Sequence, residues 1–436
     1  DYEFATETWD QGVLRVFQTN TETRQLTFEE RATARTPSRY ERYFQYETEL
    51  LGAELNLFRD FSVGSSLHRI GTGIEFLQTD TQEFRDGFQQ FLSDGSMTKT
   101  ILGETFPVRD FPNASVNEWG IFVQDEISLG NGWQLIPALR WDRYDLDPKP
   151  DAIYLEDYPE TEIVEVSEDQ ISPRLGFVRK LDSGWSLYGQ YVHGFRAPPH
   201  EDANIGLDLS FFRFRAIPNP DLKSETSRGY ELGLRQFSSG RRFSFALFET
   251  DFDDFIESRA PIGLDPASGY LIFQSRNISQ ARVQGIDIRL EQDLSVLGER
   301  WENWNLETAM YWSEGDNLDN GEALNSVSPP QAVVGLSWTS GDLLWHGSLS
   351  GTFTKRQTKI DHSGGDRFET PGYSLFDISL AYRPADQLEL RLGIRNLTDR
   401  HYWRWSDVAN LAAGDPMVDL LSQPGRNYNL SARYSW

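Results

Sequence analysis

The chain has 436 residues, with 67 acidic against 41 basic side chains and a formal net charge of -26. This balance argues against a nucleic-acid partner, because binding a phosphate backbone requires clustered Lys and Arg. The 13 Trp, 17 Tyr and 28 Phe exclude a disordered chain, and the lack of Cys excludes disulfides, thiolate metal sites and cysteine nucleophiles. No apolar stretch approaches the roughly 18 residues of a membrane helix, and no basic and apolar leader follows Asp1. If this chain crosses a membrane, strands must do so.

The strongest pattern in the sequence is an alternation of apolar and polar residues, which predicts β-strands. In chain order it is clearest over residues 119–129, 304–312, 332–338, 343–353, 376–382, 388–394 and 428–436. We expect about sixteen such strands of about 10 to 15 residues, whereas an average globular strand has about 5 to 6. A tilted strand needs about 9 to 11 residues to cross a bilayer, so the predicted strands are long enough.

The links between these segments alternate between short and long. Short turns rich in Gly, Asn, Asp and Pro are predicted at residues 130–132, 182–184, 238–240, 339–342 and 384–387. Long polar loops are predicted at residues 81–115, 147–169, 196–225, 254–275, 314–329, 356–371 and 399–424. Short turns at one end and long loops at the other are typical of an outer-membrane barrel, and they predict a C-terminus on the periplasmic side.

The two faces of the predicted strands differ in the way that a membrane barrel requires. Glu389 and Arg391 alternate with Leu388, Leu390 and Leu392, so one face is charged at its centre while the other is apolar. A soluble propeller is the alternative all-β fold, but both faces of its blades are mostly apolar and its sequence repeats about every 40 to 50 residues. We find no such repeat. The sequence therefore predicts an all-β, transmembrane, antiparallel up-and-down β-barrel.

Particular residues then match a known family. The matching stretches, in chain order, are Trp119 to Glu126, Leu139 to Tyr144, Ser172 to Gly176, Leu187 to Tyr191, Gly194 to Pro198, Asn219 to Glu225, Gly229 to Gly233, Ala281 to Asp287, Arg395 to Asp399 and the aromatic C-terminus. Each stretch is weak by itself, but their order over nearly the whole chain resembles the C-terminal barrel of the TonB-dependent outer-membrane receptors of Gram-negative bacteria. The C-terminal residues Tyr428, Leu430, Tyr434 and Trp436 then correspond to the assembly signal of such barrels.

The resemblance implies a barrel of twenty-two strands with an N-terminal plug in its lumen. Because about sixteen strands are expected here, residues 1–436 are interpreted as the later part of such a barrel, without the plug, the region that contacts TonB and roughly the first six strands. A barrel that lacks its first strands would expose two unpaired strand edges in lipid, so residues 1–436 should not be stable alone. The alternative is a complete sixteen-stranded passive porin.

Two short boxes resemble the heme and hemoglobin receptor subgroup. They are Phe195, Arg196, Ala197 and Pro198, followed by Asn219, Pro220, Asp221 and Leu222. In that subgroup the boxes flank an extracellular loop that contains a heme-ligating His. The resemblance therefore makes His200 a candidate iron ligand, although it lies earlier in the loop than expected; the alternative is a solvated His that caps the turn after Pro199.

The same loop contains an aromatic and basic cluster. Phe211, Phe212 and Phe214 could contact a porphyrin face while Arg213 and Arg215 meet its propionates, or the cluster could dock the loop on the barrel rim. No metal site or resident cofactor is predicted.

Enzyme motifs are not found, since G-x-S-x-G, G-x-x-x-x-G-K-[ST], G-x-G-x-x-G and H-E-x-x-H are all missing. The sequence predicts an energised outer-membrane receptor for heme or a hemoprotein, with a ferric siderophore receptor and a passive porin as alternatives. Its expected partners are outer-membrane lipid, lipopolysaccharide, TonB and an extracellular hemoprotein.

Overall fold

The structure is a computed structural model that describes residues 1–101, 103–159, 161–209, 213–409 and 411–435. It is dominated by long strands, each of eight residues or more. These are β2 (Gln11–Arg31), β3 (Ser38–Val63), β4 (Ser66–Phe91), β8 (Asn113–Gly130), β9 (Trp133–Lys149), β10 (Val166–Lys180), β11 (Trp185–Arg196), β14 (Glu225–Ser238), β15 (Arg241–Leu264), β16 (Leu271–Asp293), β17 (Trp304–Asn317), β18 (Gln331–Thr339), β19 (Trp345–Thr354), β20 (Tyr373–Ala385), β21 (Leu388–Arg395) and β22 (Asn427–Tyr434).

The remaining elements are short and lie mostly in the connections. The short strands are β1 (Tyr2–Phe4), β5 (Met97–Thr98), β6 (Thr100–Ile101), β7 (Glu104–Thr105), β12 (Leu207–Leu209) and β13 (Phe214–Ile217). The helices are α1 (Ala152–Asp157), α2 (His200–Asn204), α3 (Trp405–Val408) and α4 (Met417–Leu420), with 3-10 turns η1 (Asp182–Gly184), η3 (Leu294–Leu297) and η4 (Glu299–Trp301). Among the described helices, none combines the length and apolar character needed to cross a membrane.

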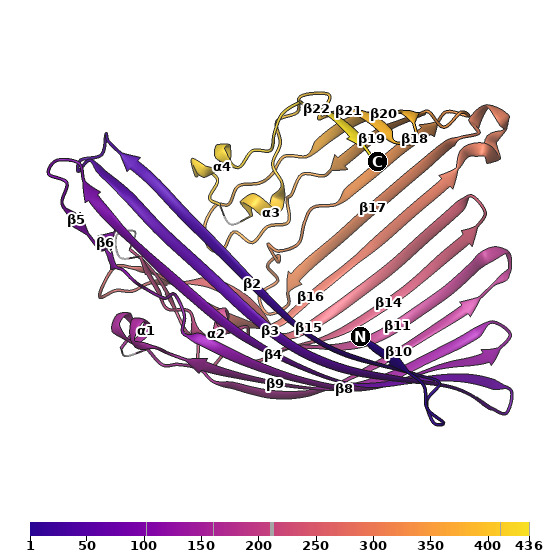
Figure 1. Cartoon of the computed structure of the whole chain (residues 1–436), viewed down its shortest axis with the longest axis horizontal. Helices are drawn as coiled ribbons and strands as arrows, with labels where there is room; N and C mark the ends of the chain where they lie inside the picture. The colour runs from indigo at the N-terminus through magenta and orange to yellow at the C-terminus, as the bar shows by residue number, and fades with distance from the viewer. Residues whose placement is uncertain (102, 160, 210–212, 410, 436) are drawn as a thin grey trace.

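The long strands form one curved antiparallel sheet in which neighbours along the chain are neighbours in space (Figure 1). The ladders continue in the same order from β9 to β22, which confirms the predicted up-and-down, all-β architecture and its strand number. Among the described residues, β22 is paired with β21 alone. One pair is parallel, because β13 returns from a long loop to lie beside β16.

The ends of the sheet differ as predicted. The five predicted short turns join β8 to β9, β10 to β11, β14 to β15, β18 to β19 and β20 to β21. At the first of them Gly130, Asn131 and Gly132 all have positive φ, a backbone conformation that Gly and Asn adopt readily. In Figure 1 these turns lie opposite to α1 and α2, which belong to the long loops.

Two predicted long loops are in fact largely strand. In the predicted loop 254–275, β15 runs to Leu264 and β16 begins at Leu271; in the predicted loop 81–115, β4 runs to Phe91. The strands continue because their backbones stay paired beyond the apolar band, where neither face needs to be apolar. Alternation of hydrophobicity, the signal used for the prediction, is therefore lost before the strand ends.

One face of the sheet carries exposed aliphatic and aromatic side chains in matched rows. Leu349, for example, pairs with Leu336 on β18 and with Ile378 on β20. The opposite face is polar, and there large side chains lie over glycines of the neighbouring strand: Tyr188 covers Gly233, where a Cβ atom would collide with its ring. We call these the apolar face and the polar face.

Candidate functional site

The first predicted box leads directly into the buried helix α2. β11 ends at Arg196, Ala197 is half-buried, and Pro198 is fully buried and accepts a hydrogen bond from the Tyr144 hydroxyl at 3.4 Å. His200 begins α2 and is only 6% exposed. The alternative interpretation of His200, as a solvated His that caps the turn after Pro199, is therefore wrong.

His200 is held in a neutral form by its surroundings. Its Nε2–H donates to the Pro112 carbonyl at 2.7 Å, and its ring meets Phe111 edge-on at 5.1 Å between centroids. Burial lowers the pKa of His200 to about 4, because an apolar environment disfavours the charged ring; the hydrogen bond to Pro112 opposes this only partly. Its Nδ1 is buried without a partner among the described residues. Whether His200 ligates iron stays a prediction.

The other residues of α2 contact two further segments, and we call the whole arrangement around α2 the α2 hub. Asp202 accepts hydrogen bonds from Ser275 at 2.8 Å and from Ser258 at 2.9 Å. Both serines lie towards the tip of the β15–β16 hairpin. Asn204 exchanges two hydrogen bonds with the backbone of Val164, at 2.7 and 2.9 Å. Asp202 and Asn204 are both buried. The α2 hub therefore joins the connections 92–112 and 150–165 to the β15–β16 hairpin.

The second predicted box is fixed to the same hairpin. Asn219 donates to the Ser275 carbonyl at 2.8 Å, and its side-chain oxygen accepts from the Asp221 N–H at 3.0 Å, which closes a tight turn over Pro220. Leu222 is buried. The structure therefore brings both boxes to the α2 hub: the first box precedes α2, and the second is bonded to Ser275, which also bonds to Asp202. Within the first box, the Arg196 guanidinium also lies 3.9 Å from Glu225 at the start of β14.

The predicted aromatic and basic cluster is only partly open to a ligand. Phe214 packs on Phe273 at 4.6 Å between ring centroids, and Arg215 forms an ion pair with Asp208 at 2.6 Å and lies over the Tyr270 ring. These contacts support the rim-docking interpretation for Phe214 and Arg215. Arg213 has a positive φ and forms a turn before β13, whereas Phe211 and Phe212 lie outside the described residues.

Sequence reasoning missed a partly buried ion-pair network beside the hub. Arg85 contacts Asp110 at 2.5 Å and Glu104 at 3.1 Å, and Arg109 contacts Asp151 at 2.9 Å. Burial raises the pKa of Asp110 and of Glu104, although Arg85 opposes this effect in both. These pairs hold the connection 92–112 and α1 on the end of the sheet. No local pattern marks them, because they join positions far apart in the chain.

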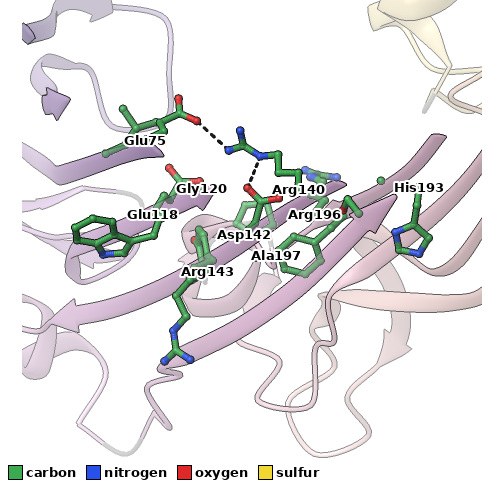
Figure 2. A pocket seen from close by; sticks show the side chains of 16 residues that line it. Glu75, Glu118, Gly120, Arg140, Asp142, Arg143, His193, Arg196 and Ala197 are labelled. Atoms are coloured by element: carbon green, nitrogen blue, oxygen red, sulfur yellow. Dashed lines mark hydrogen bonds and ion pairs between the residues drawn. The ribbon is translucent and has the colours of Figure 1, made fainter. Parts of the chain in front are cut away.

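A polar cavity of about 590 Å³ lies beneath the first box, against the polar face (Figure 2). At its centre Arg140 contacts Glu75 at 2.9 Å and Asp142 at 2.7 Å. Gly120 leaves room for this guanidinium, since a Cβ atom there would collide with it. Arg143 points away from the group in Figure 2. With Glu118 as a further lining carboxylate, the cavity suits polar or cationic groups rather than an apolar ligand.

A larger cavity of about 870 Å³ opens at the long-loop end. It lies between the β15–β16 hairpin, the loops after β17 and β19, and α3. Its walls include the aromatic side chains of Phe255, Phe273 and Trp405. Arg259 also lines it, and this exposed guanidinium makes no hydrogen bond or ion pair with another described residue. The volume lies in the range of small-molecule sites, about 300 to 1,000 Å³.

The described residues contain no group of three or more His, Asp and Glu side chains arranged to hold a metal ion. The aromatic walls and the free guanidinium of Arg259 can contact a planar or aromatic ligand with anionic groups, while Glu257, Glu322, Asp361 and Asp366 also line the cavity.

Comparison with known proteins gives the family. Residues 1–397 match the family model described as TonB dependent receptor-like, beta-barrel. A "Probable hemoglobin and hemoglobin-haptoglobin-binding protein 4" of Haemophilus influenzae is 24% identical over 278 residues, which cover 57% of this chain and 27% of that protein. The "Ferric enterobactin receptor" of Pseudomonas aeruginosa is 26% identical over 355 residues, which cover 74% of this chain and 43% of that protein. The chain thus spans less than half the length of these relatives.

A solved structure shows the same fold. The copper transporter OprC superposes with a TM-score of 0.75 at 17% sequence identity, over 100% of this chain and 64% of that one. The match over residues 1–397 shows that the chain belongs to the TonB-dependent receptor β-barrel family, whose members are receptors and transporters of the Gram-negative outer membrane and not enzymes.

Proposed function

We propose that the chain is the C-terminal part of the barrel of a receptor that takes up an iron-bearing ligand, and that this ligand is heme or heme from a hemoprotein. The observation that carries the proposal is the similarity to a hemoglobin-binding protein, together with the meeting of both heme-receptor boxes at the α2 hub. The apolar face then lies in lipid, and the long loops lie outside the cell.

The larger cavity is the proposed capture site. Phe255 and Phe273 would contact the porphyrin, and Arg259 would meet a propionate. His362, in the loop after β19, follows a residue that lines the cavity and is a second candidate iron ligand. For His200 to bind iron through Nε2, α2 would have to move away from Pro112, because Nε2 is hydrogen-bonded to the Pro112 carbonyl.

A ferric siderophore is the second candidate ligand. The ferric enterobactin receptor covers 74% of this chain, a larger share than the hemoglobin-binding relative covers. An anionic chelate would also be attracted by the free guanidinium of Arg259. The family match favours either ligand over the passive porin.

The proposed partners follow from the family. We expect TonB to act through a region outside residues 1–436, where the relatives are longer, and a plug to occupy the lumen against the polar cavity around Arg140. A hemoprotein would dock on the long loops. Outer-membrane lipid and lipopolysaccharide would cover the apolar face.

Growth on a defined iron source tests the proposal. The whole receptor is expressed in a Gram-negative strain without other heme receptors, and growth on hemin or hemoglobin as sole iron source is compared with growth on ferric enterobactin. We expect growth on hemin, and at least about a tenfold weaker hemin binding in Arg259→Ala, because a charge-assisted hydrogen bond contributes about 1.5 to 3 kcal/mol.

Arg300→Ala is the matched control, since Arg300 lies in η4 at the opposite end of the sheet. Its hemin binding should equal that of the unmodified receptor. Growth on ferric enterobactin without growth on hemin would show that the ligand is a ferric siderophore and not heme. Equal hemin binding in Arg259→Ala and Arg300→Ala would remove the larger cavity as the capture site.

A further inference from the structure

The β15–β16 hairpin contains a β-bulge beside the larger cavity. The pairing of the two strands shifts by one residue between Glu257 and Ala260, so that Ser258 and Arg259 together lie opposite the single residue Ser275. Arg259 has a φ of 49°, a backbone conformation that residues other than Gly adopt rarely. Such strain persists only where neighbouring contacts fix it, and it is concentrated at ligand sites.

Three hydrogen bonds fix the bulge to α2. The backbone N–H of Arg259 donates to Ser275 Oγ at 3.1 Å, and the same hydroxyl donates to Asp202 Oδ1 at 2.8 Å. The Ser258 hydroxyl donates to Asp202 Oδ2 at 2.9 Å. Ser275 is fully buried, and Asp202 is only 5% exposed. Both oxygens of this buried carboxylate therefore hold the bulge, one directly and one through Ser275.

The bulge changes the direction of the Arg259 side chain. Directly paired residues lie on the same face of a sheet, and the Ser275 side chain points to the buried Asp202. Without the extra residue, Arg259 would pair with Ser275, and its side chain would be directed towards the same buried region. In the observed bulge Arg259 is exposed instead and lines the larger cavity. Bulges beside ligand sites commonly redirect a side chain in this way.

We propose that Ser275 and Asp202 are positioning residues for Arg259. They hold the bulge in the conformation that directs the Arg259 guanidinium into the larger cavity, where it meets an anionic group of the ligand. An arginine that is already oriented loses less conformational freedom when the ligand binds, so the complex is tighter. The inference rests on the proposed function, in which the larger cavity captures the ligand. It gives the α2 hub a role in affinity, although neither Ser275 nor Asp202 lines the cavity.

Hemin binding to the whole receptor tests this role. Ser275→Ala removes the acceptor for the Arg259 N–H and one donor to Asp202, and we expect hemin binding to become about threefold to tenfold weaker. Ser279→Ala is the matched control, because Ser279 is also on β16 and its hydroxyl also donates to a carboxylate, Asp319, at 2.7 Å. Its hemin affinity should equal that of the unmodified receptor. Equal affinities in Ser275→Ala and Ser279→Ala would overturn the proposal.

Two comparisons separate positioning from a general loosening of the fold. Hemin dimethyl ester has no carboxylate for Arg259, so Ser275→Ala should bind the ester as tightly as the unmodified receptor does. In an Arg259→Ala background, Ser275→Ala should change hemin affinity by less than about twofold, because the effects of residues that act through one group are not additive. Equal weakening for hemin and its ester, or a full additional loss in the double variant, would show that Ser275 is only structural.

Deletion of Ser258 tests the bulge itself and does not require Ser275→Ala to fold. It leaves one residue opposite Ser275 and keeps the pairing on both sides, so the hairpin can form a regular ladder. The guanidinium of Arg259 should then leave the cavity, and hemin affinity should fall as far as in Arg259→Ala, by at least about tenfold. Unchanged affinity after the deletion would contradict the proposed role of the bulge.

A measurement without ligand separates this inference from the proposed function. A nitroxide label on Arg259→Cys, in a chain without Cys of its own, reports the motion of the bulge. Adding Ser275→Ala should make the label more mobile, whereas adding Ser279→Ala should not. Identical spectra would overturn the inference whichever ligand binds. If the unmodified receptor binds ferric enterobactin and not hemin, the proposed heme uptake fails, and the same loss in Ser275→Ala is then expected for that anionic chelate.

Discussion

His200 shows how burial changes the chemistry of a side chain. Its pKa is lowered to about 4 from an ordinary 6.5, mainly by burial. In the unfolded chain the ring takes up a proton below about pH 6.5, whereas the folded chain resists it down to about pH 4, so the stabilisation present above pH 6.5 is lost as pH falls through this window. Each pKa unit corresponds to about 1.4 kcal/mol, so the loss is about 3 kcal/mol or less.

We therefore expect the α2 amides to lose protection on acidification. Between pH 7 and pH 4.5, the hydrogen-exchange protection factors of residues 201–204, corrected for intrinsic rates, should fall by about tenfold to a hundredfold. His200→Gln, which keeps an amide donor for Pro112 but cannot take up a proton, should show a much smaller fall. Asp110 and Glu104, with raised pKa values, act in the opposite sense in both proteins, so the difference isolates His200. Identical pH dependence in both would contradict the assignment.

The position of His200 could be predicted from the sequence, but its environment could not. Its place after the first box made it a candidate, and in the structure this segment lies at a junction of several loops. Its hydrogen-bond partner Pro112 is 88 positions away in the chain. Nothing in the alternation of apolar and polar residues predicts that contact, and a polar residue in a polar loop is solvated by default.

At the scale of elements, α2 depends on its neighbours. A five-residue helix is not stable by itself, because helix nucleation is unfavourable. Asp202 supplies two of the bonds that hold α2, to Ser258 and Ser275. Hydrogen bonds to a charged acceptor contribute about 1.5 to 3 kcal/mol each. Loss of this carboxylate should therefore release the β15–β16 hairpin from the connection that contains α1.

Spin-label distances can show this release, and the lack of Cys in the chain allows two labels to be placed without a background. With labels at Glu156→Cys in α1 and Ala267→Cys at the hairpin tip, we expect one narrow distance distribution. Asp202→Ala should broaden it. Glu201→Ala, an exposed neighbour on the same helix, should leave it unchanged. A distribution that stays narrow in Asp202→Ala would show that the α2 hub does not hold the hairpin.

The element bounds show where sequence periodicity stops being informative. Short turns were predicted correctly because Gly, Asn, Asp and Pro mark them directly. The ends of β4 and β15 were predicted too early, since above the apolar band both faces are polar and only backbone pairing defines the strand. α1 and α2 were missed because each is too short to show a helical period.

At the scale of the whole molecule, the strand number and the two faces could be read from the sequence because both follow from a single alternating pattern. The loop arrangement could not, since it depends on side-chain pairs such as Arg85 with Asp110 that join separate loops. The proposed membrane placement rests on the two faces, so exchanging one residue on each face tests it most directly.

Leu349 and Ser350 are neighbours on β19 that lie on opposite faces. Leu349 sits between Leu336 and Ile378 in the apolar band, whereas Ser350 pairs with Asp377 on the polar face. Lysine in the lipid near mid-bilayer costs about 2 to 4 kcal/mol, so Leu349→Lys should lower the free energy of unfolding by about that amount, measured by urea titration of the whole receptor in lipid vesicles. Ser350→Lys should cost less than about 1 kcal/mol, because its ammonium would lie in the lumen beside the Asp377 carboxylate. If the two substitutions cost the same free energy, the apolar face does not lie in the membrane. If Ser350→Lys costs more than Leu349→Lys, our assignment of the lipid-facing side and the lumen-facing side is reversed.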